Sequence, residues 1–297
     1  MKIAVASGKG GTGKTTVAVG LALSSGRDCV GKLSRSHSPV FLDCDVEAPN
    51  AHLFMRPDLD RKVPATVLVP SIDLGRCTRC GDCAEVCRFN ALAVLGEEVL
   101  LLPELCHGCG SCALACVARA IEEVPREIGF LESGHADGVR FAHGYLNVGE
   151  AMGVPVIRLL KGWGESLEEH RTILDAPPGT SCPMVEAVMG ADYVILVTEP
   201  TPFGLHDLGL AVEVVRELGL PMGVIINRDG IGDGAVEEFC VSEELPVLLK
   251  IPFERDIAEG IARGRTLLEI RPESERHFLQ ILETIEKQVF SVSAPTT

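Results

Sequence analysis

Two runs of cysteine constrain the fold of this chain more than any other feature of its sequence. Each run has three cysteines separated by two residues and a fourth after three more, so eight of the twelve cysteines lie between residues 76 and 117. This spacing holds cubane iron–sulfur clusters, and where two clusters are present the fourth cysteine of each run binds the other cluster. The expected ligand sets are Cys77, Cys80, Cys83 and Cys116, and Cys106, Cys109, Cys112 and Cys87.

Structural zinc and disulfides are the alternative interpretations of these cysteines. Zinc sites use paired Cys-x2-Cys and need no runs of four, whereas disulfides would imply secretion. The full spacing occurs twice, which favours two [4Fe–4S] clusters. The stretch resembles bacterial two-cluster ferredoxins, including a repeat in which Cys87-Arg-Phe-Asn-Ala-Leu matches Cys116-Val-Ala-Arg-Ala-Ile. Arg88 and Val117 replace the proline that usually follows the fourth cysteine, a difference that concerns loop packing rather than ligation.

The composition is that of an acidic chain with ample residues for a core. Of 297 residues, 46% are hydrophobic, and the net charge of -15 opposes binding to nucleic acid or anionic lipid, because both need a basic face. No run of about twenty apolar residues could span a membrane, and the N-terminus becomes glycine-rich too soon for a signal peptide. Because thiolate ligands and free cysteines fit a reducing compartment, we expect a cytoplasmic protein.

A glycine-rich loop near the N-terminus is the second strong motif. It follows an apolar strand at residues 2–7 and precedes a helical pattern, which is the setting that a P-loop requires. Lys14 would reach the β- and γ-phosphates of ATP, and the Thr15 hydroxyl would bind Mg²⁺. Asp175, at the end of a later apolar strand, is the expected Walker B carboxylate for Mg²⁺. The residues expected to bind the nucleotide here are Gly8, Gly10, Gly11, Thr12, Gly13, Lys14, Thr15 and Thr16.

Strands and helices alternate along the rest of the chain, which predicts an α/β fold with a mostly parallel sheet flanked by helices. A small α+β ferredoxin-like domain at 67–124 would interrupt a P-loop ATPase domain formed by 1–66 and 125–297. Residues 147–152 are expected to begin a helix. The nearby polar residues His135, Asp137 and His143 are interpreted as a loose stretch without a role. The other expected strands are 39–42, 171–174, 193–197, 222–226 and 247–251, and the other expected helices are 205–218, 234–244 and 273–290.

The phosphate loop contains an additional lysine, Lys9, that indicates a particular class of P-loop proteins. Gly8-Lys-Gly-Gly-Thr-Gly-Lys-Thr-Thr resembles the deviant Walker A motif of the superfamily of MinD, Mrp and the nitrogenase iron protein. The resemblance implies an ATP-bound homodimer in which Lys9 of each chain reaches the nucleotide of the other. A second ammonium near the γ-phosphate would stabilise the charge of the transition state, as arginine fingers do.

Several downstream segments match the same superfamily. Asp43 and Asp45 match its first switch, which implies that Asp45 orients the attacking water and that Asp43 supports Mg²⁺ from its outer shell. A pair of solvated turn aspartates is the alternative. Gly179 lies in the match to the second switch, which senses the γ-phosphate through a backbone N–H. Asn227 and Pro252 match the positions that bind adenine and close over the base.

Cys182 lies seven residues after Asp175, and the nitrogenase iron protein has a cluster ligand at a similar offset. Two Cys182 thiolates of a dimer could therefore face each other and serve a cluster, a metal ion or an electron relay. A buried packing cysteine is the alternative. The chain offers no evident second ligand for a site made of four thiolates.

These motifs lead to three hypotheses about function. In the first, ATP binding and hydrolysis are coupled, through switching of a dimer, to electron transfer through the clusters to an unidentified partner protein. In the second, the chain is a metallocluster carrier or assembly ATPase that transfers a cluster to an acceptor. In the third, it is a MinD-like positioning ATPase with structural or sensory clusters, although its acidic C-terminal helix disfavours direct membrane binding.

Overall fold

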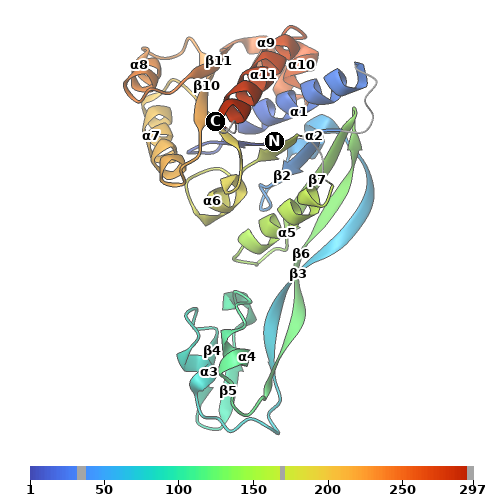
Figure 1. Cartoon of the computed structure of the whole chain (residues 1–297), viewed down its shortest axis with the longest axis vertical. Helices are drawn as coiled ribbons and strands as arrows, with labels where there is room; N and C mark the ends of the chain where they lie inside the picture. The colour runs from blue at the N-terminus through green and yellow to red at the C-terminus, as the bar shows by residue number, and fades with distance from the viewer. Residues whose placement is uncertain (32–37, 168–170, 293–297) are drawn as a thin grey trace, which may run out of the picture.

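The computed structural model describes residues 1–31, 38–167 and 171–292 (Figure 1). Within these residues a nine-stranded sheet has the strand order β11-β10-β9-β1-β8-β2-β7-β6-β3. Neighbours from β11 to β7 pair in parallel, whereas β6 pairs antiparallel with both β7 and β3, so the predicted mostly parallel sheet is confirmed. The strands are β1 (Lys2–Ala6), β2 (Val40–Asp43), β3 (Asp58–Ile72), β6 (Ile121–Ala136), β7 (Val139–Leu146), β8 (Thr172–Asp175), β9 (Tyr193–Thr198), β10 (Met222–Asp229) and β11 (Val247–Pro252).

Helices cover both faces of the sheet, because its central strands are apolar on both sides. In β1, for example, Ile3 and Val5 join one buried cluster, whereas Ala4 and Ala6 join the other. Because neighbouring strands run in the same direction, their carboxyl ends lie at one edge of the sheet. Open α/β sheets bind their ligands at this edge. One face carries α1 (Lys14–Gly31), α2 (Ala51–Met55), α9 (Arg255–Ala262), α10 (Leu267–Ile270) and α11 (Ser274–Val292). The other carries α5 (Val154–Glu165), α6 (Cys182–Val188), α7 (Pro202–Glu217) and α8 (Ala235–Ser242).

The strands β3 and β6 extend beyond the sheet as a two-stranded antiparallel ribbon (Figure 1). Residues 129–136 of β6 pair with β7, whereas residues 121–127 pair with β3 and not with β7. We call the projecting part, residues 66–72 and 121–127, the arm. The predicted domain boundaries at residues 67 and 124 lie inside it, two rungs of the ribbon apart.

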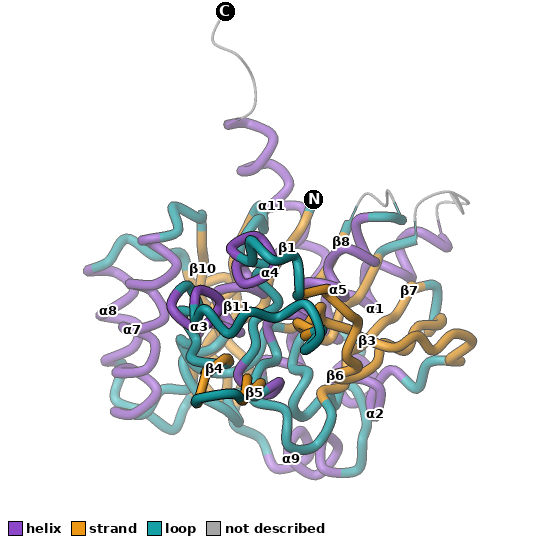
Figure 2. The backbone as a smooth tube through the Cα atoms, turned by 90° about the horizontal axis from the view of Figure 1, so that it is seen from below, coloured by secondary structure: helices purple, strands orange, loops and turns teal. Residues whose placement is uncertain are grey.

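The arm ends in a small head, residues 73–120, that contains both cysteine runs. Figure 2 looks along the arm from the end that carries the head, so the head is nearest to the viewer. Its strands β4 and β5 form an antiparallel hairpin, and two short helices follow the two cysteine loops. The head consists of α3 (Asp82–Glu85), β4 (Leu92–Leu95), β5 (Glu98–Leu101), the 3₁₀ helix η1 (Pro103–Leu105) and α4 (Ser111–Ala115). The ferredoxin-like character of this head stays a prediction.

The expectation of a helix beginning within residues 147–152 is wrong. Glu150 N–H donates to the Asn147 carbonyl in a turn, and Gly149 adopts a left-handed φ of 90° that a helix does not contain. The helix α5 begins later, at Val154, with a proline in its first turn. A proline fits there because the first N–H groups of a helix have no partner within it.

The interpretation of His135, Asp137 and His143 as a loose polar stretch is also wrong. The two strands β6 and β7 form a hairpin whose turn residues, Asp137 and Gly138, both have positive φ. His143 is only 1% exposed, in the middle of β7. Alternation of larger side chains at Val139, Phe141, His143 and Tyr145 is the period-2 signal of this strand.

Candidate functional site

The phosphate loop lies at the carboxyl end of β1 and leads directly into α1. Its glycines are required sterically: a Cβ on Gly8 would lie 2.0 Å from the Asp207 carbonyl oxygen, and one on Gly13 would lie 2.2 Å from the Asn227 side-chain nitrogen. Beside the loop is a cavity of about 420 Å³. The predicted residues that line it are Lys9, Gly10, Gly11, Gly13, Lys14, Thr15, Thr16, Asp45, Asn227 and Pro252.

The predicted residues Gly8, Thr12, Asp43, Asp175 and Gly179 do not line this cavity but support its wall. Gly179 N–H donates to the Ser7 carbonyl at 2.9 Å, so in this structure it braces the start of the loop. The Thr12 hydroxyl is buried and has no hydrogen-bond partner within the described part of the chain. Both carboxylates, by contrast, are partnered and fully buried, and they form the polar centre of the site.

Adjacent strands place Asp43 and Asp175 opposite each other, since the two residues pair in the register of β2 and β8. Asp175 forms an ion pair with Lys14 of the phosphate loop. Asp43 accepts three backbone hydrogen bonds, from Asp45 at 3.1 Å and from Asn50 and Ala51 at 3.0 Å each. These bonds hold the first switch and the start of α2 to the end of β2.

The site contains more acid than one lysine can balance. Burial, together with the nearby charge of Asp175, raises the pKa of Asp43 to about 7. Burial also raises the pKa of Asp45. Although burial alone lowers the pKa of Lys14, the neighbouring carboxylates, Asp175 first, raise it above the ordinary value. The arrangement therefore favours an additional cation.

One carboxylate atom is available for such a cation. Asp175 Oδ2 is buried and has no hydrogen-bond partner among the described residues. Carboxylate and hydroxyl oxygens are the ligands that Mg²⁺ prefers, and the Thr15 side chain belongs to the same cavity wall. The residues present fit Mg²⁺ bound together with a phosphate.

The far end of the cavity is apolar and has one amide at its edge. Asn227 donates from Nδ2 to the Thr12 carbonyl at 2.8 Å, and its Oδ1 accepts from Arg228 N–H at 2.9 Å. Pro252 and Phe253 form one part of the wall, and Phe253 is 58% exposed. The apolar lining that sequence reasoning missed includes Phe54, Ile257, Ile261 and Leu267. Such a surface suits the flat face of a nucleobase.

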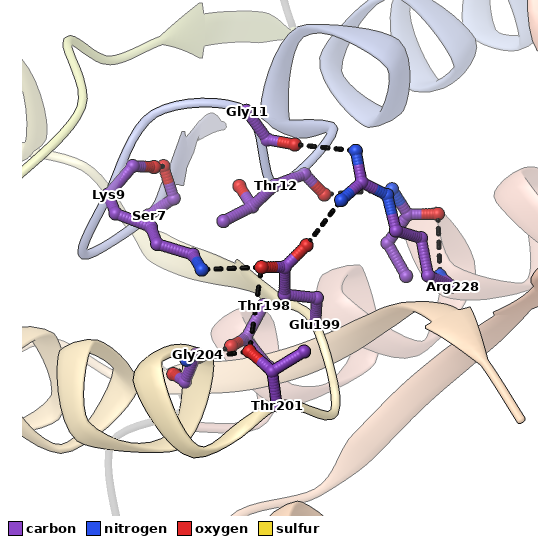
Figure 3. Close-up of polar contacts among 10 residues, drawn as sticks. Ser7, Lys9, Gly11, Thr12, Thr198, Glu199, Thr201, Gly204 and Arg228 are labelled. Atoms are coloured by element: carbon purple, nitrogen blue, oxygen red, sulfur yellow. Dashed lines mark hydrogen bonds and ion pairs between the residues drawn. The ribbon is translucent and has the colours of Figure 1, made fainter. Parts of the chain in front are cut away.

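Lys9 is paired within its own chain (Figure 3). Its ammonium forms an ion pair with Glu199, which follows β9 and which sequence reasoning missed. Glu199 also accepts from Arg228 Nη1 at 2.6 Å, and Arg228 Nη2 donates to the Gly11 carbonyl at 3.3 Å. No local motif marks Glu199 or Arg228, because each meets Lys9 or its loop only through the parallel packing of β1, β9 and β10.

In the head, the eight cysteines surround two separate cavities. Cys77, Cys80, Cys83 and Cys116 line one, and Cys87, Cys106, Cys109 and Cys112 line the other. The fourth cysteine of each run therefore lies with the first three of the other run, which is the arrangement expected from the spacing. Burial raises the pKa of Cys83 and of Cys112, which are equivalent positions of the two runs.

The two halves of the head repeat their backbone geometry. Positive φ recurs at equivalent residues: Arg79 and Gly108, Gly81 and Gly110, Asn90 and Arg119. In each half a backbone N–H four residues further along donates to the last cysteine of the run, Ala91 to Cys87 and Ala120 to Cys116, both at 3.3 Å. Left-handed residues let a short loop turn its N–H groups inward, toward a group with negative charge.

Across the described ranges 1–31, 38–167 and 171–292, no three His, Cys, Asp or Glu side chains converge to hold a single metal ion. In the head, the cysteine thiols line two cavities instead. Four cysteines around each cavity are the donor set of a [4Fe–4S] cluster, so the residues present fit two such groups.

Comparison with known proteins identifies the larger part of the chain. Residues 3–267 match the model of the CobQ/CobB/MinD/ParA nucleotide-binding domain. The chain belongs to this MinD/ParA family of P-loop ATPases. An uncharacterized protein of Methanocaldococcus jannaschii is 30% identical over 90% of this chain and 91% of its own length. An iron–sulfur cluster carrier protein of Pyrococcus furiosus is 25% identical over 89% of this chain and 77% of its own length.

Among solved structures, MinD of Pyrococcus horikoshii, complexed with Mg-ADP, shares the fold of this MinD/ParA protein. Its TM-score is 0.58 at 20% identity, over 97% of this chain and 96% of the MinD chain. The fold is thus the one that the motifs predicted. The residue roles proposed for the switches and the cysteines are not tested by these similarities.

Cys182 is the first residue of α6 and is exposed, so the alternative of a buried packing cysteine is wrong for this position. It lies beyond the second switch, separated in the chain from both cysteine runs. Among the described residues, every helix is too short or too polar to span a lipid bilayer.

Proposed function

We propose that this MinD/ParA family member binds MgATP, forms a homodimer, and couples ATP hydrolysis to electron transfer through two [4Fe–4S] clusters in its head. The observation that carries the proposal is the position of the arm. Its strand β3 begins at Asp58, directly after the helix α2 that ends the first switch. A single strand of 15 residues, β3, therefore connects the nucleotide site to the cysteine head.

At the nucleotide site, each of the expected binding and catalytic residues has a separate role. Lys14 and the backbone N–H groups of the loop bind the phosphates, and Thr15 and Asp175 hold Mg²⁺, which when bound neutralises phosphate charge. Asp43 supports this site through its hydrogen bonds to the first switch. Asp45 orients the attacking water at the cavity wall. Gly179 exchanges its bond to Ser7 for one to the γ-phosphate.

A change in the first switch has two routes into the arm. The first is covalent, because α2 leads into β3 through Arg56, which has a left-handed φ of 48°. The second crosses to β6: the His52 ring lies 5.2 Å from the His143 ring, and His143 Nε2 is 3.1 Å from Glu132. The switch is thus linked to β3 and β6 in the parts of these strands that lie in the sheet and lead into the arm. A shift of α2 on hydrolysis would move the head, or alter its exposure to a partner protein.

In the head, the crossed cysteine sets would hold the two clusters, which supply one-electron chemistry when bound. The N–H donors of Ala91 and Ala120 lower the charge density on Cys87 and Cys116 and so influence the potential of each cluster. These bonds are equivalent in the two halves.

The proposal is tested by the rate at which the reduced protein passes electrons to a small artificial acceptor. Oxidation of the clusters would be followed by visible absorbance without nucleotide, with MgADP and with MgATP. MgATP should change the rate in the wild-type protein. Asp45→Asn should keep the MgATP effect but lose its decay on hydrolysis. Identical rates in all three conditions would disprove coupling within the protein alone.

A second candidate function is transfer of an iron–sulfur cluster to an acceptor protein. It is favoured by the relative named as an iron–sulfur cluster carrier and by the exposure of Cys182. Under this proposal, transfer to an apo-ferredoxin depends on ATP and is lost in Cys182→Ala, whereas the neighbouring Ser181→Ala is unaffected. Cluster transfer that is independent of ATP and unchanged in Cys182→Ala would contradict this second proposal and leave only the electron-transfer proposal.

A further inference from the structure

Lys9 does not lie free at the surface of the single chain. Its side chain is 27% exposed, and the Glu199 carboxylate that pairs with it is 10% exposed. Ser7 Oγ donates to the Lys9 carbonyl at 2.8 Å, which fixes the backbone of the loop beside the pair. An ion pair partly withdrawn from water is stronger than one on an open surface, so Lys9 has a defined resting position.

Glu199 is itself held on several sides (Figure 3). Arg228 donates to Oε2 at 2.6 Å, whereas Lys9 and Thr201 both approach Oε1, Thr201 at 3.5 Å. The same Thr201 caps α7 by accepting from Gly204 N–H at 3.0 Å. Arg228 keeps a left-handed φ of 56°, a conformation that a non-glycine residue adopts only when its surroundings impose it. Glu199 is therefore a fixed acceptor, built from the ends of β9 and β10.

We propose that Glu199 is a positioning residue that retains Lys9 within its own chain until the γ-phosphate of a second copy replaces it. The proposal rests on the proposed function, in which Lys9 acts on the nucleotide of a partner. A terminal phosphate carries more negative charge than one carboxylate and can take the ammonium from it. ADP lacks that group and leaves Lys9 on Glu199. When Lys9 departs, Arg228 remains to balance the charge of Glu199.

This arrangement makes dimer formation depend on the triphosphate rather than on any bound nucleotide. Each dimer must break two Lys9–Glu199 pairs, one from each chain. Since a partly exposed pair is worth up to about fivefold in an equilibrium constant, removing both should tighten ATP-dependent association by about tenfold. The same change should allow measurable association with ADP, because no competitor for Lys9 remains.

The test uses Glu199→Gln, which keeps the size of the side chain and removes its charge. Self-association of the full chain would be measured by sedimentation with a non-hydrolysable ATP analogue and with ADP. We expect Glu199→Gln to associate about tenfold more tightly than wild type with the analogue. Glu199→Asp, which retains the carboxylate, should stay close to wild type. The matched control is Glu213→Gln, an exposed glutamate on α7, which should change nothing.

A merely structural role for Glu199 predicts the opposite sign. If Glu199→Gln associates as wild type does, or more weakly, the positioning role is wrong. In the background of Lys9→Ala the Glu199→Gln effect should disappear, and its persistence would equally overturn the inference. Absence of analogue-dependent association in wild type would instead refute the nucleotide-driven dimer itself, and with it this inference.

Discussion

The two ends of the molecule bind their proposed ligands in different ways. At the nucleotide end, buried charges from the ends of three strands and from the phosphate loop meet at the edge of a sheet that has a large apolar core on both faces. Where the head joins the arm, the described residues form two small buried hydrophobic clusters, to which the arm contributes Val69 and Ile121: Val69, Ala91 and Cys106, and Leu92, Cys112 and Ile121. Two of these six residues, Cys106 and Cys112, are cysteines that are expected to bind iron–sulfur clusters.

This difference indicates how each end is stabilised. The sheet buries enough apolar surface to fold without nucleotide, and ATP only redistributes its charges. A unit as small as the head has little core of its own, so metal groups contribute directly to its folding. We therefore expect nucleotide to act on a preformed site and the clusters to act as part of the structure of the head.

Removing cysteines should have the largest effect, because the loss of one ligand is expected to remove the whole iron–sulfur cluster that it binds. If ligation is crossed, Cys83→Ala with Cys87→Ala damages both cavities and the iron content falls from about eight atoms per chain to near zero. Cys87→Ala with Cys106→Ala damages one cavity, and about four should remain. Iron analysis with EPR distinguishes the two. Equal losses in both double variants would contradict the crossed assignment.

Lys14→Ala, at the nucleotide end, should have the next largest effect. It removes the phosphate ligand and leaves Asp175, which is fully buried, without its ion-pair partner. We expect at least about 100-fold weaker ATP binding by calorimetry, and a loss of about 3 kcal/mol in the free energy of unfolding, as for other buried charges left unpaired. Lys9→Ala is the control and should retain ATP binding by the single chain. Comparable losses in both variants would show that the two lysines are not distinct.

His143→Phe should have a smaller effect that is confined to communication between the ends. It removes the hydrogen bond to Glu132 on β6 while it preserves a ring beside His52. ATP affinity should stay within about twofold, whereas the effect of ATP on hydrogen exchange in residues 121–127 should fall by about half, in the range of couplings measured along packed networks. His135→Phe, at an exposed position on the neighbouring strand β6, is the matched control. An unchanged response in His143→Phe would exclude the route through β6.

The pH dependence of stability should report on the nucleotide end alone. Because the pKa of Asp43 is raised to about 7, the folded protein retains a proton there that the unfolded chain releases near its ordinary value of 3.8. Stability of the nucleotide-free protein should therefore fall as pH rises from about 4 to about 7 through this group. Urea unfolding of Asp43→Asn should show a flatter profile than wild type over that window. Parallel profiles would mean that Asp43 is ionised throughout.

The parts of this arrangement that were predictable from sequence are those that are local in the chain. The phosphate loop and the cysteine runs keep their chemistry within a few residues, so spacing alone indicates them. The mostly parallel sheet follows from the alternation of apolar segments and helices. The hairpin of β6 and β7 was missed, because a charged residue, Arg140, and two glycines, Gly138 and Gly144, obscure its alternation.

The partners of the functional residues were not predictable in the same way. Glu199 lies 190 residues from Lys9, and His52 meets His143 only because β2 and β7 are neighbours in the sheet. Such pairs depend on strand order, which no local pattern records. The crossed cysteine sets were an exception, since an internal repeat places equivalent residues in equivalent positions.

The proposed function requires that the state of the nucleotide changes the redox behaviour of the head. The most direct measurement is an EPR-monitored redox titration of the protein without nucleotide, with MgADP, and with MgATP in Asp45→Asn. We predict that MgATP shifts the midpoint potential of at least one cluster by roughly 60 mV, a tenfold change for a one-electron couple, and that Lys14→Ala abolishes the shift. Identical potentials in all three states, with both clusters present, would contradict the proposed coupling between the nucleotide site and the head.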